Sequence, residues 1–218
     1  MEIKTEKQRN LTQLAVHGGF WLSILRATNA ISKLISKVIL ARLLAPHDFG
    51  LMGIALIVIT GIEQLSIIGF RPALIQKRKN TDEYLDTAWT VQVIRGMMLF
   101  VILFTSAPLV AAFFGSPGAT LIIRAIAIIE LLSGFRNIGI IYFEKELEFN
   151  KQFVYQISGN MMNVIVAVFL AFIFRSVWAL VFGILAGNLV LCVMSYIIHP
   201  YRPKLDLNLG KANDLFTF

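Results

Sequence analysis

No charged side chain interrupts FVYQISGNMMNVIVAVFLAFIF, residues 153–174, or SVWALVFGILAGNLVLCVMSYII, residues 176–198. A helix rises about 1.5 Å per residue, so roughly 20 apolar residues are needed to cross the ~30 Å hydrocarbon core of a bilayer. Both stretches meet this length, and Arg175 alone separates them. They therefore predict two transmembrane helices joined by a tight turn.

Four further apolar stretches precede this pair. Three of them carry few charges and predict spans at residues 49–70, 87–114 and 119–143. The first stretch, residues 18–44, is interrupted by four bases, Arg26, Lys33, Lys37 and Arg42. We expect this stretch to cross the membrane as well, and the alternative is that it lies on the membrane surface.

These stretches predict an all-α fold class, a polytopic membrane bundle of six transmembrane helices. The bundle occupies residues 18–199, and a cytoplasmic segment, residues 1–17, precedes it. Residues 200–218 are expected to form a cytoplasmic connector and the start of a seventh helix. Within the bundle, the small-xxx-small pair Gly183 and Gly187 predicts close helix packing.

The composition supports a membrane protein and excludes several other classes. Of the 218 residues, 57% are hydrophobic and 15% are charged, and the mean hydropathy is +0.73. A water-soluble globule cannot bury so much apolar surface, so the net charge of +7 needs a membrane explanation and does not indicate a nucleic-acid partner. The one cysteine, Cys192, and three scattered histidines form no disulfide or metal-ligand pattern. Nucleotide-binding and hydrolase motifs are missing too, so we predict no catalytic residue, metal or cofactor.

The basic residues of the connectors gather on one side of the membrane. That side holds Lys4, Lys7, Arg9, Arg71, Lys77, Arg78, Lys79, Lys145, Lys151, Arg202, Lys204 and Lys211. The opposite connectors hold only Arg42 and Arg175. Because cytoplasmic loops retain positive charge, the N-terminus is predicted to be cytoplasmic. Three acids beyond the basic run at residues 77–79 are interpreted as a solvated loop and helix start, namely Asp82, Glu83 and Asp86.

Several charges fall within the predicted spans, where each costs a few kcal/mol. Counted at ~1.5 Å per residue from the cytoplasmic end, Arg26, Glu63, Arg95 and Arg136 lie roughly 10 to 15 Å deep, and Lys33 and Glu130 lie roughly 20 Å deep. Glu63 is predicted to pair with Arg95 or Arg26. Glu130 is predicted to pair with Lys33 or Arg136. The bases that stay unpaired would attract an anion.

This surplus of bases predicts an aqueous, cationic cavity. The candidate substrate-binding residues are Arg26, Lys33, Arg95 and Arg136. Glu63 and Glu130 are candidates for ion coupling or for structural ion pairs. Candidates for sugar contact are the amides of Asn29, Asn160, Asn163 and Asn188, although bonding between helices is the commoner role of such amides. The alternative for the charged set is internal salt bridges that orient the helices.

Several segments, taken together, resemble a known family. They are ARLLAPHDFG at residues 41–50, ALIQK at 73–77, AAFFG at 111–115, FEKELEF at 143–149, WALV at 178–181 and PYRPK at 200–204. In wording and order they are similar to the Wzx-type lipid-linked oligosaccharide flippases of bacteria. The match is to the colanic-acid and teichuronic-acid branch, within the superfamily that includes multidrug and toxin extruders. The similarity runs from about residue 10 to the end of the sequence.

The resemblance implies two helical lobes around a cationic cavity that faces each side of the bacterial inner membrane in turn. In that family the cavity accommodates the pyrophosphate and glycan of an undecaprenyl carrier. Family members are about twice as long, so this sequence looks like the N-terminal lobe. We expect a fragment or truncated product that lacks a C-terminal lobe, and the alternative is that two copies assemble one cavity.

The resulting expectation is a transporter rather than an enzyme. It would move an anionic lipid-linked oligosaccharide across the inner membrane for polysaccharide biosynthesis, in contact with membrane lipid. Three alternatives stay open: an ion-coupled drug or metabolite antiporter of the same superfamily, a membrane-embedded transferase acting on lipid-linked sugars, and a non-transporting subunit. None of the resembling segments identifies a substrate-binding residue, so the site candidates rest on depth and charge alone.

Overall fold

The computed structural model describes residues 2–66, 82–146 and 148–206, and it places the side chains of residues 23–66, 84–146 and 148–206. Every regular element within these ranges is helical, which confirms the all-α class. In chain order the helices are α1 (Glu2–Leu43), α2 (Pro46–Leu65), α4 (Asp82–Phe113), α5 (Ala119–Gly134), the 3-10 helix η1 (Ile138–Ile140), α6 (Ile141–Lys145), α7 (Phe149–Phe174) and α8 (Trp178–Ile198).

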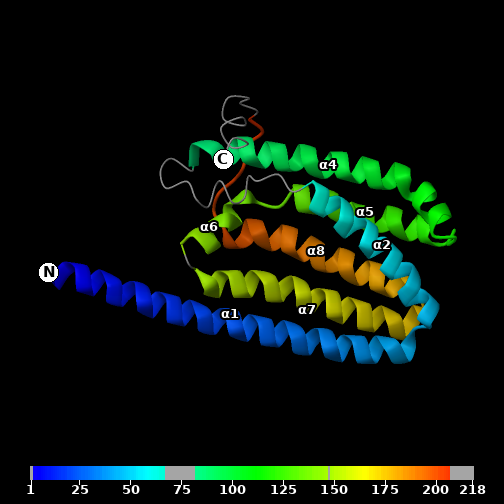
Figure 1. The fold of residues 1–218 in the computed structure, drawn as a ribbon, viewed down its shortest axis with the longest axis horizontal. Coiled ribbons are helices and arrows are strands. Elements are labelled where there is room, and N and C mark those ends of the chain that lie inside the picture. The colour runs from blue at the N-terminus through cyan, green and yellow to red at the C-terminus, as the bar shows by residue number, and fades with distance from the viewer. Residues whose placement is uncertain (1, 67–81, 147, 207–218) are drawn as a thin grey trace.

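The long helices lie side by side along one direction (Figure 1). α7 packs against α1 and α8, α5 packs against α4 and α8, and α2 packs on α5. In Figure 1, α1 and α4 form opposite edges of the bundle, and the N-terminal part of α1 extends beyond its neighbours. α5, α7 and α8 are therefore the long helices with neighbours on both sides.

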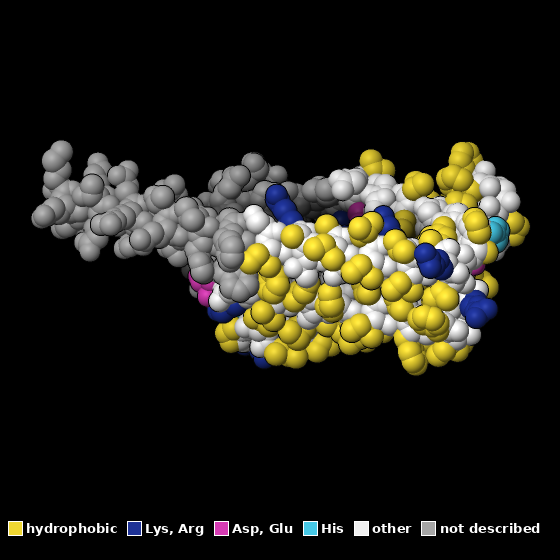
Figure 2. All heavy atoms as spheres, turned by 90° about the horizontal axis from the view of Figure 1, so that it is seen from below, with side chains coloured by type: hydrophobic (Ala, Val, Ile, Leu, Met, Phe, Trp, Pro, Cys, Tyr) yellow, Lys and Arg dark blue, Asp and Glu magenta, His cyan; other side chains and the backbone are white. Residues whose placement is uncertain are grey.

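Apolar side chains from α2, α4, α5 and α8 form the main core. Among its fully buried members are Leu103 of α4, Ile126 of α5 and Val181 of α8. Other large apolar side chains face outward, such as Ile57 and Phe169, which are 65% and 63% exposed. Figure 2 shows apolar side chains over much of the face formed by the described residues. An apolar outer surface is suited to lipid rather than to water.

Four helices are long and apolar enough to cross a membrane. They are Pro46–Leu65, Tyr84–Phe113, Phe149–Phe174 and Trp178–Ile198. These helices match four of the predicted spans. The other two predicted spans correspond to α1, which contains the four bases named above, and to α5, whose 16 residues reach about 24 Å. Six crossings therefore stay a prediction.

The span predicted at residues 119–143 is broken, which corrects the sequence interpretation. α5 ends at Gly134, and the chain turns through η1 and α6 before α7 begins. Gln92 of α4 stabilises this break, because its side-chain amide lies 3.0–3.1 Å from the carbonyl oxygens of Ser133, Gly134 and Arg136. These carbonyls have lost their helical donors, and the Gln92 amide supplies a replacement.

The structure adds detail at both ends of the described chain. The first helix begins at Glu2, so the segment at residues 1–17 is largely helical and continuous with the first predicted span. At the other end, residues 199–206 are not helical. The seventh helix expected at the end of the sequence falls on residues 207–218, outside the described residues.

Glycines allow two pairs of helices to approach closely. A Cβ added at Gly183 of α8 would lie 2.6 Å from the Cβ of Ala167 on α7, and one added at Gly187 would lie 2.8 Å from the Gly159 carbonyl oxygen. The close packing predicted from the Gly183 and Gly187 spacing is thus confirmed. On the other side of the bundle, Gly96 of α4 meets α5 in the same way.

Asp48 links two turns at one end of the bundle. Its carboxylate accepts hydrogen bonds from the backbone amide of Ala45, at 3.1 Å, and from that of Val177, at 3.1 Å. The first amide precedes α2 and the second precedes α8, where Arg175 adopts a left-handed φ of 46°. The α1–α2 and α7–α8 turns therefore lie together, as the predicted topology requires.

Candidate functional site

A buried acid lies in the interior of the bundle. Glu130 of α5 is 2% exposed, and its Oε1 atom has no hydrogen-bond partner within the described part of the chain. Burying a carboxyl without a partner is costly, so such a group usually has a functional or a charge-balancing role. Its nearest ionisable neighbours are Glu63, Arg95 and Arg136, all of which act on it electrostatically. These four residues are called the charge cluster below.

Arg136 follows α5 and reaches toward α8. Its Nη2 atom donates a hydrogen bond to Oδ1 of Asn188, and the Asn188 amide nitrogen donates in turn to the Ile184 carbonyl oxygen at 2.8 Å. The Nε atom of Arg136 is buried and has no partner among the described residues. The Nη2 end of this guanidinium is thus fixed by α8, while its Nε donor is unused.

Arg95 fixes the end of α2 beside the same acid. Its Nε atom donates to the Ser66 carbonyl oxygen at 3.0 Å, and its Nη2 atom donates to the Ser66 hydroxyl at 2.7 Å. Ser66 caps the C-terminus of α2, where the partial negative charge of a helix favours a cation. Arg95 therefore connects α4 to α2, the helix that contributes Glu63.

The structure brings together four of the charged residues proposed from their depth. Glu63, Arg95, Glu130 and Arg136 come from α2, α4, α5 and the segment after α5, and they meet at one level of the bundle. Within the described ranges, no ion pair of 4 Å or less joins either acid to one of the predicted basic partners. The bases lie near the acids without an ion pair of this length, so the predicted pairing is reduced to electrostatic proximity.

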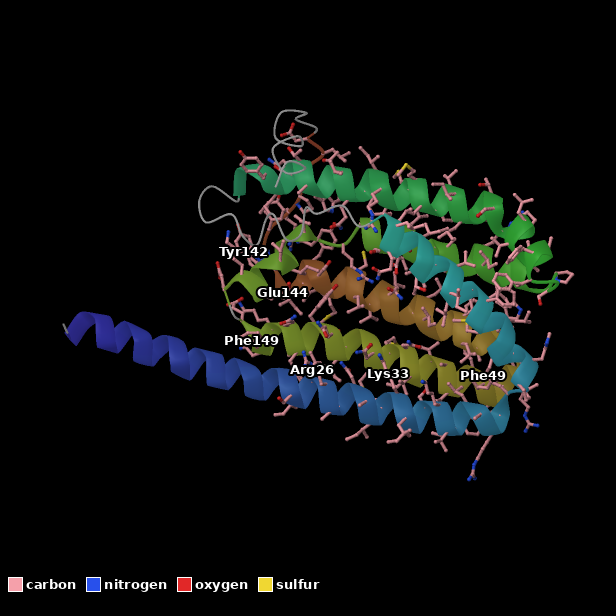
Figure 3. The ribbon with its side chains drawn as sticks, in the orientation of Figure 1. Arg26, Lys33, Phe49, Tyr142, Glu144 and Phe149 are labelled. Carbon is pink, nitrogen blue, oxygen red and sulfur yellow. The ribbon has the colours of Figure 1, made fainter. Side chains whose placement is uncertain are left out.

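The bases of α1 are placed differently. Arg26 and Lys33 lie along α1 beside α7, as Figure 3 shows, and both side chains are exposed. Between them, the Oδ1 atom of Asn29 accepts a hydrogen bond from the Asn160 amide nitrogen of α7 at 2.8 Å. Figure 2 shows basic side chains and an acidic side chain set into a hollow at one edge of the described surface. No contact joins the α1 bases to the charge cluster among the described residues.

The remaining amide candidates are engaged between helices. Asn163 lies against α8, because a Cβ added at Gly183 would lie 3.0 Å from its Oδ1 atom and one added at Gly187 would lie 2.9 Å from its Cβ. Asn160 bonds α1, and Asn188 bonds Arg136. These contacts match the role of interhelical bonding, and sugar contact stays a prediction.

A second polar group was missed by the sequence interpretation. Residues 199–206, called the strap below, run from the end of α8 back to the start of α4. Asp86 was interpreted as solvated, but it is half-buried and accepts hydrogen bonds from the Tyr201 hydroxyl and from the Lys204 amide. Asn137, which is fully buried, donates to the Tyr201 carbonyl oxygen at 2.7 Å. Its burial was not predictable, because only the break after α5 brings it inside.

Comparison with known proteins gives a consistent result. The sequence signature of a family described as polysaccharide biosynthesis protein matches residues 39–218. The succinoglycan biosynthesis transport protein ExoT of Rhizobium meliloti (strain 1021) is 23% identical over 90% of this chain and 40% of its own length. The teichuronic acid biosynthesis protein TuaB of Bacillus subtilis (strain 168) is 23% identical over 96% of this chain and 44% of its own.

A third relative belongs to the same group. The lipopolysaccharide biosynthesis protein WzxC of Escherichia coli (strain K12) is 23% identical over 93% of this chain and 42% of its own length. The chain thus spans less than half the length of these curated relatives. No solved structure matches it significantly. With the signature covering most of an all-helical, apolar bundle, the chain belongs to the polysaccharide biosynthesis protein family.

Proposed function

We propose that this chain is a lobe of a flippase that moves an anionic lipid-linked oligosaccharide from the cytoplasmic to the outer leaflet during polysaccharide biosynthesis. The observation that carries the proposal is the charge cluster, a group of ionisable side chains inside a bundle whose outer surface is apolar. Charges inside a membrane protein are costly and are typical of substrate and ion pathways. The names of the relatives, which refer to transport and to succinoglycan or lipopolysaccharide biosynthesis, indicate the substrate class.

The bases are proposed to act in two places. Arg26 and Lys33, which are exposed on α1, meet the pyrophosphate group as it enters from the cytoplasmic side. Arg95 and Arg136 then compensate the charge of the headgroup deeper in the bundle. Arg136 has unused donor capacity for this purpose, because its Nε atom has no partner among the described residues. Neither step requires covalent chemistry.

The acids of the charge cluster are proposed to couple ion movement to the change of state. Glu130 is buried beside Glu63, so loss or gain of a cation there changes the balance of charge around Arg95 and Arg136. A flippase that faces each side of the membrane in turn needs such a difference between its two states. Whether the cation is a proton or sodium does not alter this role.

The orientation proposed is an N-terminus in the cytoplasm of a bacterial cell and spans in the inner membrane. Lys145 ends α6, Lys151 lies in the first turn of α7, and Arg202 follows α8. These bases therefore share the end of the bundle opposite the Asp48 link. A basic end opposite a less basic one is the pattern that the positive-inside rule associates with the cytoplasm. Labelling of single cysteines placed in the two sets of turns tests this assignment.

Complementation tests the transport function. Residues 1–218, and separately a version extended by a C-terminal lobe, are expressed in cells that lack their own flippase, and surface polysaccharide is measured. Restored export by either version supports transport. If residues 1–218 restore export without a C-terminal lobe, copies of the chain assemble into the transporter. If neither version restores export at normal membrane abundance, the proposed function is wrong.

Neutral variants test the role of the bases in whichever version is active. We expect Arg26→Gln, Lys33→Gln and Arg95→Gln, made one at a time, to abolish export without lowering the amount of protein in the membrane. Lys37→Gln is the matched control, because Lys37 is an exposed base of the same helix α1 that is not among the candidates. Retained export in all three variants would remove the cationic pathway.

A second candidate, an ion-coupled antiporter for a cationic drug or metabolite, is favoured by one observation. Glu130 is a buried acid, and acids are the groups that bind cationic substrates. Expression that raises resistance to cationic compounds, and loses this effect in Glu130→Gln, would support the antiporter over the flippase.

A further inference from the structure

The strap crosses three elements at one end of the bundle. It begins at the end of α8, passes α6 and ends against α4, where the backbone amides of Lys204 and Asp206 donate to Asp86 Oδ1 at 2.9 Å and to Thr90 Oγ1 at 3.0 Å. Both amides are thus held by side chains rather than by a helix or sheet. Bonds of this kind open locally when their anchor is disturbed.

His199 is the first residue of the strap and fits closely against its surroundings. Its ring stacks on Tyr142 of α6 with centroids 5.6 Å apart and an interplanar angle of 7°, and it lies 6.0 Å from the ring of Phe143. Gly139 of η1 provides the space, because a Cβ at this position would collide with the imidazole. Figure 3 shows Tyr142 beside the end of the bundle where α7 begins.

The hydrogen bonding of His199 requires a neutral ring. Its Nδ1 atom accepts a hydrogen bond from the Tyr201 amide at 3.2 Å, so this nitrogen must carry a lone pair. A proton at Nδ1 would face the proton of the Tyr201 amide and abolish the bond. The tautomer with hydrogen on Nε2 is therefore the one that fits the strap.

We propose that the strap is a pH-dependent latch controlled by His199. The neutral imidazole, stacked on α6, fixes the backbone of Tyr201, whose side chain reaches Asp86 of α4, and protonation of the imidazole releases the strap. The proposal does not depend on the transported substrate. It concerns the end of the bundle that the proposed topology places in the cytoplasm.

The charged groups around His199 are consistent with this assignment. Glu146 follows α6, Glu148 and Lys151 lie at the start of α7, and Arg202 belongs to the strap itself. Burial, followed by the positive charge of Lys151, lowers the pKa of His199 from 6.5, and the two glutamates oppose this effect. The stacked ring of Tyr142 also faces Lys145, whose Nζ atom lies 5.6 Å from the ring centroid.

Hydrogen exchange of the strap amides measures directly whether the strap is held against the bundle or released. The chain of residues 1–218 is reconstituted, and the protection of the Lys204 and Asp206 amides is compared at about pH 7.5 and at a lower pH at which NMR of the His199 ring shows it to be protonated, with intrinsic exchange rates divided out. We expect protection in the wild-type chain to be lost at the lower pH. In His199→Asn, which offers an acceptor oxygen that does not titrate in this range, we expect protection to be equal at both pH values.

Two controls keep the measurement decisive. Thr90→Val removes the acceptor of the Asp206 amide and leaves His199 intact, so it should lower protection of that amide at both pH values. Exchange of the α8 amides reports whether each variant is folded, and His199→Phe, which keeps the stacked ring, replaces His199→Asn if the latter does not fold. Equal protection of the wild-type strap at both pH values overturns the proposal. The proposal is also wrong if the His199 variant, which cannot titrate, loses as much protection at the lower pH as the wild type does.

Discussion

Replacement of Gly96 by alanine tests the close approach of α4 to α5. A Cβ added at Gly96 would lie 2.6 Å from the Glu130 carbonyl oxygen and 2.9 Å from the Gly134 Cα atom. Ordinary van der Waals contact for a Cβ begins at 3.4 Å, and both neighbours are backbone atoms of a helix, which cannot rotate away. The added methyl group must therefore move α5 away from α4 by several tenths of an ångström.

We expect Gly96→Ala to lower the free energy of unfolding by about 1–3 kcal/mol, the usual cost of overpacking a core. Gly61→Ala in α2 is the matched control, because nothing lies within 4 Å of a Cβ added there. In that control the higher helix propensity of alanine should be neutral or should stabilise by up to about 1 kcal/mol. The measurement is thermal unfolding of both variants in one detergent. If Gly96→Ala unfolds at the same temperature as Gly61→Ala, the inferred contact between α4 and α5 does not exist.

Four further predictions concern other parts of the bundle. Arg175→Gly should raise the free energy of unfolding by up to about 1 kcal/mol, because the φ of 46° is strained for a residue with a side chain; thermal unfolding measures it. Gln92→Leu should lower the free energy of unfolding by about 1–3 kcal/mol, since the carbonyl oxygens of Ser133, Gly134 and Arg136 lose their hydrogen bonds from the Gln92 amide. Because the pKa of His199 is lowered on folding, the folded chain binds fewer protons than the unfolded chain. Its contribution to stability is therefore complete above about pH 6.5 and falls as the pH drops through the lowered pKa, a dependence that denaturant titration should show for the wild type and not for His199→Asn. Glu130→Gln should abolish polysaccharide export at unchanged membrane abundance in the complementation assay, and export at the wild-type level would separate this acid from transport.

The local sequence pattern was sufficient to predict those helices whose length and position depend on their own composition. α7 and α8 lack charges over more than 20 residues, so the hairpin at Arg175 follows from length and hydrophobicity alone. The spacing of Gly183 and Gly187 likewise predicts the close contact with α7, because two glycines four residues apart share one helical face.

The end of α5 could not be predicted in this way. The apolar sequence continues past Gly134, and the break depends on Gln92, which lies more than 40 residues earlier and bonds three carbonyl oxygens at and just after the end of α5. The strap could not be predicted for the same reason, because its position depends on contacts between residues that are distant in the sequence. Tyr201 meets Asp86 across 115 positions of the sequence, and hydropathy contains no information about such a pairing.

Part of the candidate site could be predicted from the sequence, because the depth of a residue in the membrane follows from its position along its helix. A rise of about 1.5 Å per residue was enough to place Glu63, Arg95 and Arg136 at one level, whereas Glu130 was expected deeper, beside Lys33, and meets the other three in the structure. The direction in which each side chain points depends on helix rotation, which is set by packing. For that reason Arg95 bonds Ser66 rather than Glu63, and Arg26 lies outside the cluster.

The double acceptor role of Asp48 gives the bundle a fixed point about which helices can turn. Its carboxylate joins the amides that precede α2 and α8, so these two helices start from one place and cannot separate there. α2 has 20 residues and is about 30 Å long, so a rotation of about 5° about this point moves its far end, which carries Glu63 and Ser66, by about 3 Å. That displacement equals the length of a hydrogen bond. A small pivot at Asp48 is therefore enough to break the bonds between Arg95 and Ser66 and to open the charge cluster at the opposite end.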